Sequence, residues 1–262
     1  MALEKLEGRI TVPTGGYTFD VTEDPADSAT ITVAAGDYYL TSTTSILTTI
    51  QTALNAAGLG GTYTVSIDDN SDTSLGKVTI SATGITSFAI TWTAPAPGVL
   101  GALLGFTGDV AATLSATGAE QAEYLWLPPV MRTNPTSPNW ASTSYSMGYQ
   151  ESDFIFTMAP SGASKRTVYN RRFAEHFEWG QVIATKMKIG HETTVNGSLE
   201  KFWQDVFFYG YPFRYHPDRS SDTVFWTFVN ADAGDFKPAP EVATWEGVAS
   251  LWRYSFLGRK LV

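Results

Sequence analysis

Polar and apolar residues alternate along short stretches of the first hundred residues, which is the pattern of half-buried β-strands. The spacing changes to three and four residues at Ile46, Ile50 and Leu54, after possible N-caps at 42–44 and before Gly58 as a stop. This pattern predicts one amphipathic helix over residues 46–57. Residues 99–106 form a short apolar turn that can be helical. We expect strands at residues 9–12, 17–21, 29–33, 37–40, 62–68, 77–82 and 88–92.

The remainder of the chain has longer alternating stretches and more aromatic residues. Ser198 can cap a helix over residues 198–209 that is apolar on most sides and ends at Gly210. Strands are expected at residues 123–127, 145–157, 166–177, 181–189, 223–229 and 249–260, with a short edge-like strand within 211–218. The predicted fold is β-rich with two helices: an antiparallel β-sandwich flanked by one helix, plus a smaller α+β N-terminal module.

Charge divides the chain into two differently built parts. The 262 residues carry a net charge of −9, but residues 1–130 hold 13 acidic and 3 basic residues, whereas residues 131–262 hold 13 and 14. Prolines are frequent between residues 127 and 138, which disfavours a helix or a central strand there. We therefore expect an acidic Thr/Ala/Gly-rich module at 1–108, a linker and proline-rich loop at 109–138, and an aromatic-rich β-sandwich at 139–262.

Composition excludes several classes of protein. The chain has no cysteine, so disulfides and thiolate metal sites are impossible. It contains no run of eighteen apolar residues, and its N-terminus is acidic where a signal peptide is basic, so we expect no membrane span and synthesis in the cytoplasm. The overall negative charge argues against sequence-specific nucleic-acid binding.

The histidines and carboxylates of the sequence do not form a recognisable catalytic or metal-binding motif. His176, His191 and His216 lack the spacing of a zinc site, and we expect a structural role for His216. Residues 68–72 place three aspartates as a calcium loop begins, but Thr73 replaces the required glycine, and a solvated hairpin turn is the favoured interpretation. The many carboxylates leave a glycosidase-like pair open as an alternative. We expect no enzymatic activity, no cofactor and no metal.

Two groups of residues are candidates for contacts between molecules. Aromatic side chains dominate protein–protein hot spots, and a basic patch within an acidic chain can pair with a neighbouring copy. The interface candidates are Phe208, Tyr211, Trp252, Arg171 and Arg172.

The C-terminal residues resemble a phage protein family. The stretches 199–203 and 210–218 (GYPFRYHPD), followed by the terminal strand 254–262, look like the end of distal-tail-type minor tail proteins of long-tailed bacteriophages. The first module is similar to a segment of phage virion proteins, with a Gly-Tyr-Thr strand at 16–18, a helix, hairpin strands and a Leu-Gly-Phe ending at 104–106. Typical short members of the family lack this acidic module.

The resemblance implies a β-sandwich with one helix that assembles as a ring, usually of six copies, between the tail tube and the tip. The chain is then a structural protein of the virion tail, with tube and hub proteins as partners. In such a ring a second acidic cluster could line the path of the DNA: Asp20, Glu23, Asp24 and Asp27. Two alternatives remain open, a head-surface or head–tail joining virion protein, and a carbohydrate-binding β-sandwich with Trp92, Trp140 or Trp245 as sugar-stacking platforms.

Overall fold

The structure is a computed structural model of the whole chain. Backbone positions are described for residues 5–24, 27–42, 44–69, 74–93, 98–127, 142–158, 164–183, 199–207, 209–216, 226–238 and 251–260. Side chains are described for these ranges up to residue 127, and then for residues 201, 202, 204–206 and 209–216.

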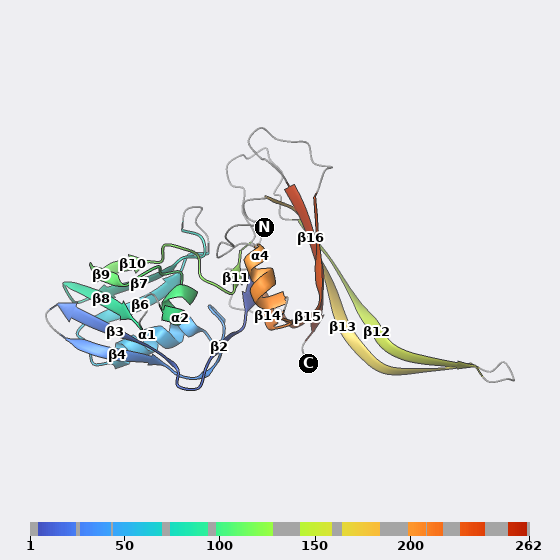
Figure 1. Cartoon of the computed structure of the whole chain (residues 1–262), viewed down its shortest axis with the longest axis horizontal. Coiled ribbons are helices and arrows are strands. Elements are labelled where there is room, and N and C mark those ends of the chain that lie inside the picture. Colours follow the sequence, from blue (N-terminus) through green and yellow to red (C-terminus); the bar gives the residue numbers. More distant parts are fainter. Residues whose placement is uncertain are drawn as a thin grey trace.

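The β-rich fold expected from the sequence is confirmed. The described residues form four antiparallel sheets of seven, four, three and two strands, together with three short α-helices and one π-helical turn. We use the name N-terminal unit for residues 10–117, which hold three of the sheets, and the name long sheet for the seven-stranded sheet. Figure 1 shows the N-terminal unit on one side and the long sheet on the other.

Two sheets of the N-terminal unit share one core. The four-stranded sheet has the order β4-β3-β8-β9, the three-stranded sheet has the order β10-β7-β6, and Leu114 is the only residue between β9 and β10. Alternation along β3 buries Phe19, Val21 and Glu23 and exposes the residues between them. The strands are β3 (Tyr17–Asp24), β4 (Ser28–Val33), β6 (Thr62–Ile67), β7 (Val78–Thr83), β8 (Ser87–Trp92), β9 (Val110–Thr113) and β10 (Ser115–Thr117); β2 (Ile10–Val12) pairs separately with β5 (Gly36–Tyr38).

Helix α1 (Ile46–Ala56) packs beside β4 and β6 and matches the sequence prediction closely. Its cap is Ser45 and not one of the candidates expected at 42–44: the Ser45 side chain accepts a hydrogen bond from the Thr48 amide at 3.2 Å. Its polar face also satisfies the outer edge of β6, because Gln51 Oε1 accepts from the Val65 amide and Asn55 bonds both the amide and the carbonyl of Tyr63. An edge covered in this way cannot pair with another chain.

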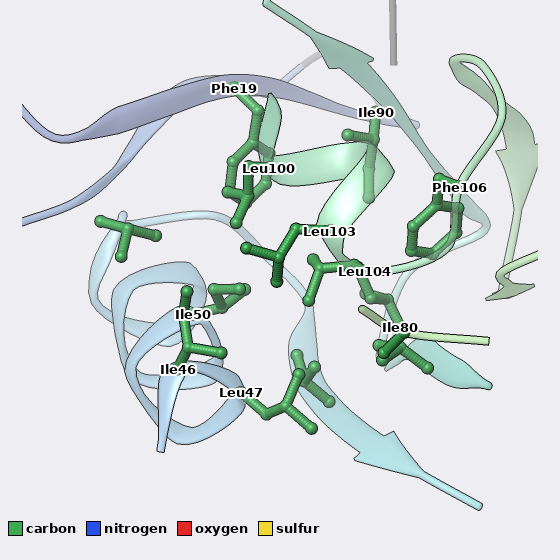
Figure 2. Packing of buried hydrophobic residues seen from close by; sticks show 14 of the residues in the cluster. Phe19, Ile46, Leu47, Ile50, Ile80, Ile90, Leu100, Leu103, Leu104 and Phe106 are labelled. Atoms are coloured by element: carbon green, nitrogen blue, oxygen red, sulfur yellow. The ribbon is translucent and has the colours of Figure 1, made fainter. Parts of the chain in front are cut away.

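Figure 2 shows how the helices fill the core of the N-terminal unit. Ile46, Leu47 and Ile50 of α1 face the short helix α2 (Gly98–Leu103), which contributes Leu100 and Leu103. The apolar residues that alternation turns inward from the strands complete this cluster, among them Phe19, Ile80 and Ile90. Burial of this apolar surface is the main stabilising contribution to the unit.

The long sheet draws strands from both ends of the chain. Its order is β11-β1-β14-β15-β16-β13-β12, so β1 (Lys5–Gly8) lies between β11 (Leu125–Trp126) and β14 (Pro212–His216). The remaining strands are β12 (Ser142–Met158), β13 (Ser164–Ile183), β15 (Trp226–Pro238) and β16 (Leu251–Lys260). The N-terminal unit is therefore inserted between two neighbouring strands of this sheet, β1 and β11.

Three local expectations differ from the structure. The segment expected to be a linker, 109–138, contains β9 and β10, because its short Ala/Thr stretches pair with β8 and β7, while β11 lies within the strand expected at 123–127. The two strands expected at 166–177 and 181–189 are one continuous strand up to Ile183. The helix expected at 198–209 is α4 (Leu199–Phe202) followed by a π-helical turn, Trp203–Phe207, and the Tyr211 amide donates to the Val206 carbonyl at 3.0 Å just beyond it.

Strands β12 and β13 form a long hairpin, which we call the ribbon. They pair from Ser142 with Gly180 out to Met158 with Ser164, with register shifts around Asp153. Pairing between β13 and β16 begins only at Ala174. Residues 164–173 of β13 consequently pair with β12 alone among the described strands, and Figure 1 shows the ribbon running away from the rest of the chain. Within the described residues, no helix combines the length and the apolar character that crossing a membrane requires.

Candidate functional site

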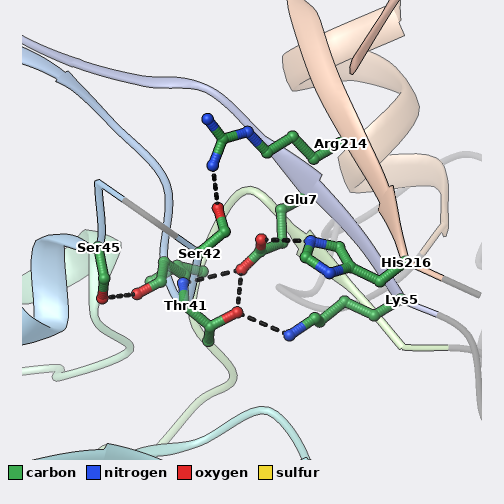
Figure 3. A network of polar contacts seen from close by, with 8 residues as sticks. Lys5, Glu7, Thr41, Ser42, Ser45, Arg214 and His216 are labelled. Carbon is green, nitrogen blue, oxygen red and sulfur yellow. Dashed lines mark hydrogen bonds and ion pairs between the residues drawn. The ribbon is translucent and has the colours of Figure 1, made fainter. Parts of the chain in front are cut away.

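A buried polar network lies where the N-terminal unit meets the long sheet. Strand register places Lys5 opposite His216 and Glu7 opposite Arg214, on neighbouring strands β1 and β14. The segment after β5 brings Thr41 and Ser42 against these strands (Figure 3). We call these six residues the junction network.

Glu7 is the centre of the junction network. Its Oε2 atom lies 2.8 Å from His216 Nε2, and its Oε1 atom accepts hydrogen bonds from the Thr41 amide at 2.8 Å and from the Thr41 hydroxyl. The side chains of Glu7 and His216 are both 0% exposed. Because a buried carboxylate is costly without partners, this density of donors explains how a charged residue occupies the middle of a sheet.

Two further cations complete the junction network. Lys5 Nζ donates to Thr41 Oγ1 at 2.7 Å, and Arg214 donates to the Ser42 hydroxyl. The Arg214 guanidinium also lies over the Tyr39 ring, 3.7 Å from its centroid, which is the geometry of a cation–π contact. Each contact joins a strand of the long sheet to residues 39–42, so the network holds the N-terminal unit against that sheet.

The charged neighbours of Glu7 control its ionisation. Burial alone would raise the pKa of Glu7, but the hydrogen bond with His216, the charge of Lys5 and the other partners outweigh burial and lower the pKa to about 2. Glu7 is therefore ionised throughout the range in which proteins normally function.

The junction network has the residue types of a catalytic site but not the access. A histidine, a carboxylate and a hydroxyl lie within hydrogen-bond distance, as in hydrolases. However, Glu7 and His216 are fully buried, and no substrate atom can approach a group without exposed surface. His216 Nδ1 and Arg214 Nε are buried without a hydrogen-bond partner in the described part of the chain. The arrangement is suited to fixing two parts of a protein relative to each other.

The acidic cluster expected to line a channel is split by strand alternation. Asp20 and Asp24 lie on the outer face of β3, and Asp27 is exposed beyond it. Glu23 faces inward and is 6% exposed, so its assignment as a lumen-facing acid is wrong. Alternation along a strand of period two turns Glu23 to the side opposite Asp20 and Asp24.

Glu23 instead holds the loop that follows α1. Its carboxylate accepts hydrogen bonds from the Gly60 amide at 2.8 Å, the Gly61 amide at 3.1 Å and the Tyr63 hydroxyl at 2.7 Å. Burial, and then the contact with Glu23, raise the pKa of Tyr63 far above its ordinary value. Glu23 therefore has a structural role, because its carboxylate accepts hydrogen bonds only from groups of the chain itself, two backbone amides and one hydroxyl, among the described residues.

Of the five interface candidates, the structure describes the side chain of Tyr211 and the strand positions of Arg171, Arg172 and Trp252. Tyr211 is 43% exposed and stacks on Tyr209, which is 63% exposed, with ring centroids 5.5 Å apart. Arg171 and Arg172 lie on the part of β13 that pairs only with β12, opposite Glu151 and Gln150. Trp252 lies on β16 between Val182 and Pro238. Phe208 lies outside the described residues.

Of the other candidate residues, some lie in the core and others lie outside the part of the chain that the structure describes. Trp92 is 3% exposed and packs between Phe19 and Phe106, so it is not a sugar-stacking platform. Trp140, Trp245, Asp72 and His191 lie outside the described residues, and His176 is on β13. Asp68 accepts a hydrogen bond from the Ser74 hydroxyl within the β6–β7 connection. No group of three potential metal-ligating side chains occurs among the residues described.

Sequence reasoning did not identify Lys5, Glu7, Thr41 or Arg214 as members of a site. The only early signal is that residues 5–8, KLEG, precede the first expected strand with charges on both sides of Leu6. All four residues of β1 are buried, because Thr41 contacts Lys5 and Glu7 on one face and Val206 lies against Gly8 on the other. Periodicity cannot reveal partners such as His216, which is more than two hundred residues away.

Comparisons with known proteins identify no relative of this chain. No family model matches the chain, and neither a curated protein nor a solved structure shows a significant match to it.

Proposed function

We propose that the chain is a structural protein of a bacteriophage tail, in which copies form a homo-oligomeric ring, most simply of six, that joins the tail tube to the tip. The observation that carries the proposal is the ribbon. Its strand β12 has 17 residues, about 56 Å of extended chain at about 3.3 Å per residue. A compact domain of 262 residues has a radius of gyration of only about 18 Å. The ribbon therefore has the length to reach a neighbouring molecule.

The strand edges of the ribbon support self-assembly. The outer edge of β12, and that of β13 over residues 164–173, pair with no other described strand. A long unpaired edge is a template for pairing with another chain, and a neighbouring copy is one way to cover it. A head-to-tail contact whose rotation closes into a ring covers every such edge with a limited number of copies.

The junction network supports a structural role rather than catalysis. A ring needs each copy to keep one shape, and a buried, multiply hydrogen-bonded carboxylate fixes the N-terminal unit against the long sheet. The resemblance of residues 199–203, 210–218 and 254–262 to distal-tail proteins supports the proposed location, the virion tail, after synthesis in the host cytoplasm.

Native mass spectrometry of the purified chain tests the ring. Six copies of a 28.5 kDa chain give about 171 kDa, and negative-stain images should show closed rings. Antibody labelling of intact particles containing the chain should then mark the distal end of the tail. A label at the head would favour the head–tail joining alternative, and a monomer absent from particles would contradict the proposal.

The exposed acids of the N-terminal unit are proposed to face the channel of this ring. Asp20, Asp24 and Asp27 repel a passing DNA chain, whereas lysines at these positions would retain it. Exchanging all three for lysine should slow genome ejection in a salt-dependent way, because salt screens exposed charges. Ejection rates equal to those of the unmodified particle would place these acids elsewhere.

A further inference from the structure

An exposed pair of tyrosines, with half-buried acids nearby, follows helix α4 and its π-helical turn. Tyr209 and Tyr211 stack with an interplanar angle of 23°, and both are substantially exposed. Only four large hydrophobic side chains of the described residues are exposed to this degree, and these two are in contact. We call Tyr209, Tyr211, Glu123 and Asp205 the tyrosine patch.

The tyrosine patch has an excess of negative charge. Asp205 forms an ion pair with Lys201 at 2.6 Å. Glu120 and Glu123 are close enough to interact with this pair, so the described group holds three acids and one base. Burial raises the pKa of Glu123, Lys201 lowers it, and the neighbouring carboxylates of Asp205 and Glu120 raise it further. An incoming cation would relieve the repulsion among these carboxylates.

The same acids act on Tyr124, which connects the tyrosine patch to strand β1. Burial, followed by the charges of Asp205 and Glu123, raises the pKa of Tyr124 to about 12. The Tyr124 carbonyl accepts a hydrogen bond from the Gly8 amide at 2.7 Å, and its backbone has a φ of +57°. Tyr124, which lies between Glu123 of the patch and strand β11, is therefore hydrogen-bonded to β1, a strand whose four residues are all buried, which favours a rigid surface for docking.

The outer segment of the ribbon, residues 149–158 and 164–173, is a basic part of an acidic chain. It holds Lys165, Arg166, Arg171 and Arg172 against two acids, a net charge of +2, whereas the rest of the chain sums to −11. Arginine stacks on tyrosine faces and pairs with carboxylates, so the patch offers both of the groups that it prefers. The chain already uses this chemistry internally, where Arg214 lies over Tyr39.

We propose that the basic outer segment of the ribbon of one copy docks on the tyrosine patch of a second copy. The inference rests on the proposed ring and names the two surfaces that meet in it. The ribbon runs away from α4 in Figure 1, so a copy does not place its own outer segment on its own patch. The contact is head-to-tail, because the ribbon and the patch are different surfaces.

Cysteine cross-linking tests this contact cleanly because the full chain has no cysteine. One preparation carries Tyr211→Cys, and a second carries Arg171→Cys or Arg172→Cys, since successive residues of a strand lie on opposite faces. Mixing the two and adding a short bismaleimide should give a covalent dimer of about 57 kDa, twice 28.5 kDa. Each preparation alone should give none. The control replaces Tyr211→Cys by Thr22→Cys on the exposed face of β3.

Charge reversal gives an independent measurement. Arg172→Glu should raise the dissociation constant of the assembly by about tenfold or more, as expected for a charge placed against carboxylates. Lys77→Glu makes the same change of charge in the N-terminal unit and should leave the assembly unchanged.

The outcomes separate the two proposals. A ring that forms while the Tyr211→Cys mixture cross-links no better than the Thr22→Cys control overturns the docking contact and leaves the ring standing. Equal effects of Arg172→Glu and Lys77→Glu also overturn it. A monomer in native mass spectrometry at every concentration removes the ring and, with it, the contact.

Discussion

The substitution Glu7→Gln removes the charge at the centre of the junction network and keeps the size of the side chain. The pKa of Glu7 is about 2 in the folded protein against an ordinary value of 4.5. A difference of about 2.5 units corresponds to roughly 3 kcal/mol in favour of the folded state when Glu7 is ionised. Glu7→Gln also leaves the buried Lys5 ammonium without the charge of Glu7, and an uncompensated buried charge costs about 3–5 kcal/mol in other proteins, which agrees with this value. We expect Glu7→Gln to lower the free energy of unfolding by roughly 3 kcal/mol at pH 7.

The dependence on pH has a definite sign. The folded state lowers the pKa of Glu7, so its contribution is fully present above pH 4.5 and is lost as the pH falls towards 2. The difference in stability between the wild-type chain and Glu7→Gln should therefore be constant from pH 7 to pH 5 and shrink below pH 4.5. Urea unfolding followed by tryptophan fluorescence at a series of pH values measures this difference.

Glu120→Gln is the matched control, because the same chemical change is made at an exposed glutamate. It should alter the free energy of unfolding by less than about 0.5 kcal/mol. The electrostatic account of the junction is refuted if Glu7→Gln behaves like this control at pH 7. It is also refuted if the loss of stability persists undiminished at pH 2, since packing alone would then explain it.

Three other substitutions probe the N-terminal unit by thermal or urea unfolding. Glu23→Ala should cost about 2 kcal/mol because it leaves buried donors without their acceptor, whereas Asp24→Ala on the outer face should be nearly neutral. Gly105→Ala should cost about 1–3 kcal/mol, because φ is +86° and a Cβ atom would press on the backbone of residues 120–121; Gly108→Ala, which meets nothing, should not. Ser45→Ala should cost about 1 kcal/mol by removing the cap of α1, and a loss below a quarter of that would contradict the capping role.

The N-terminal unit could be predicted well because its signals are local. Helix α1 lies within a residue of the expected bounds, since the apolar spacing and Gly58 act within a few residues of one another, although the cap is Ser45 and not a residue of 42–44. The strands with alternating residues were also found. The error at Glu23 arises because the strand expected at 17–21 continues to Asp24, so the same alternation places this carboxylate in the core.

The junction network could not be predicted because its members meet only in the folded sheet. Glu7 and His216 are 209 residues apart, and their contact depends on β1 pairing with β14 in one register. A shift by one residue would turn Glu7 away from its partners. Sequence reasoning assigned His216 a structural role and its neighbours none, because charged residues in a short strand are typical of a solvated edge.

The position of β1 explains why the buried network matters for a ring. Strand β1 begins the chain, lies between β11 and β14 in the long sheet, and leads directly into the N-terminal unit. The chain connects the unit to the sheet at two neighbouring strands, β1 and β11. The contacts of Glu7, Lys5 and Arg214 with residues 39–42 add a third attachment away from these two connections and restrict movement of the unit about them. Acids on the outer face of β3 and the ribbon at the other end of the molecule then keep a fixed relation in every copy, which a closed ring with a uniform channel requires.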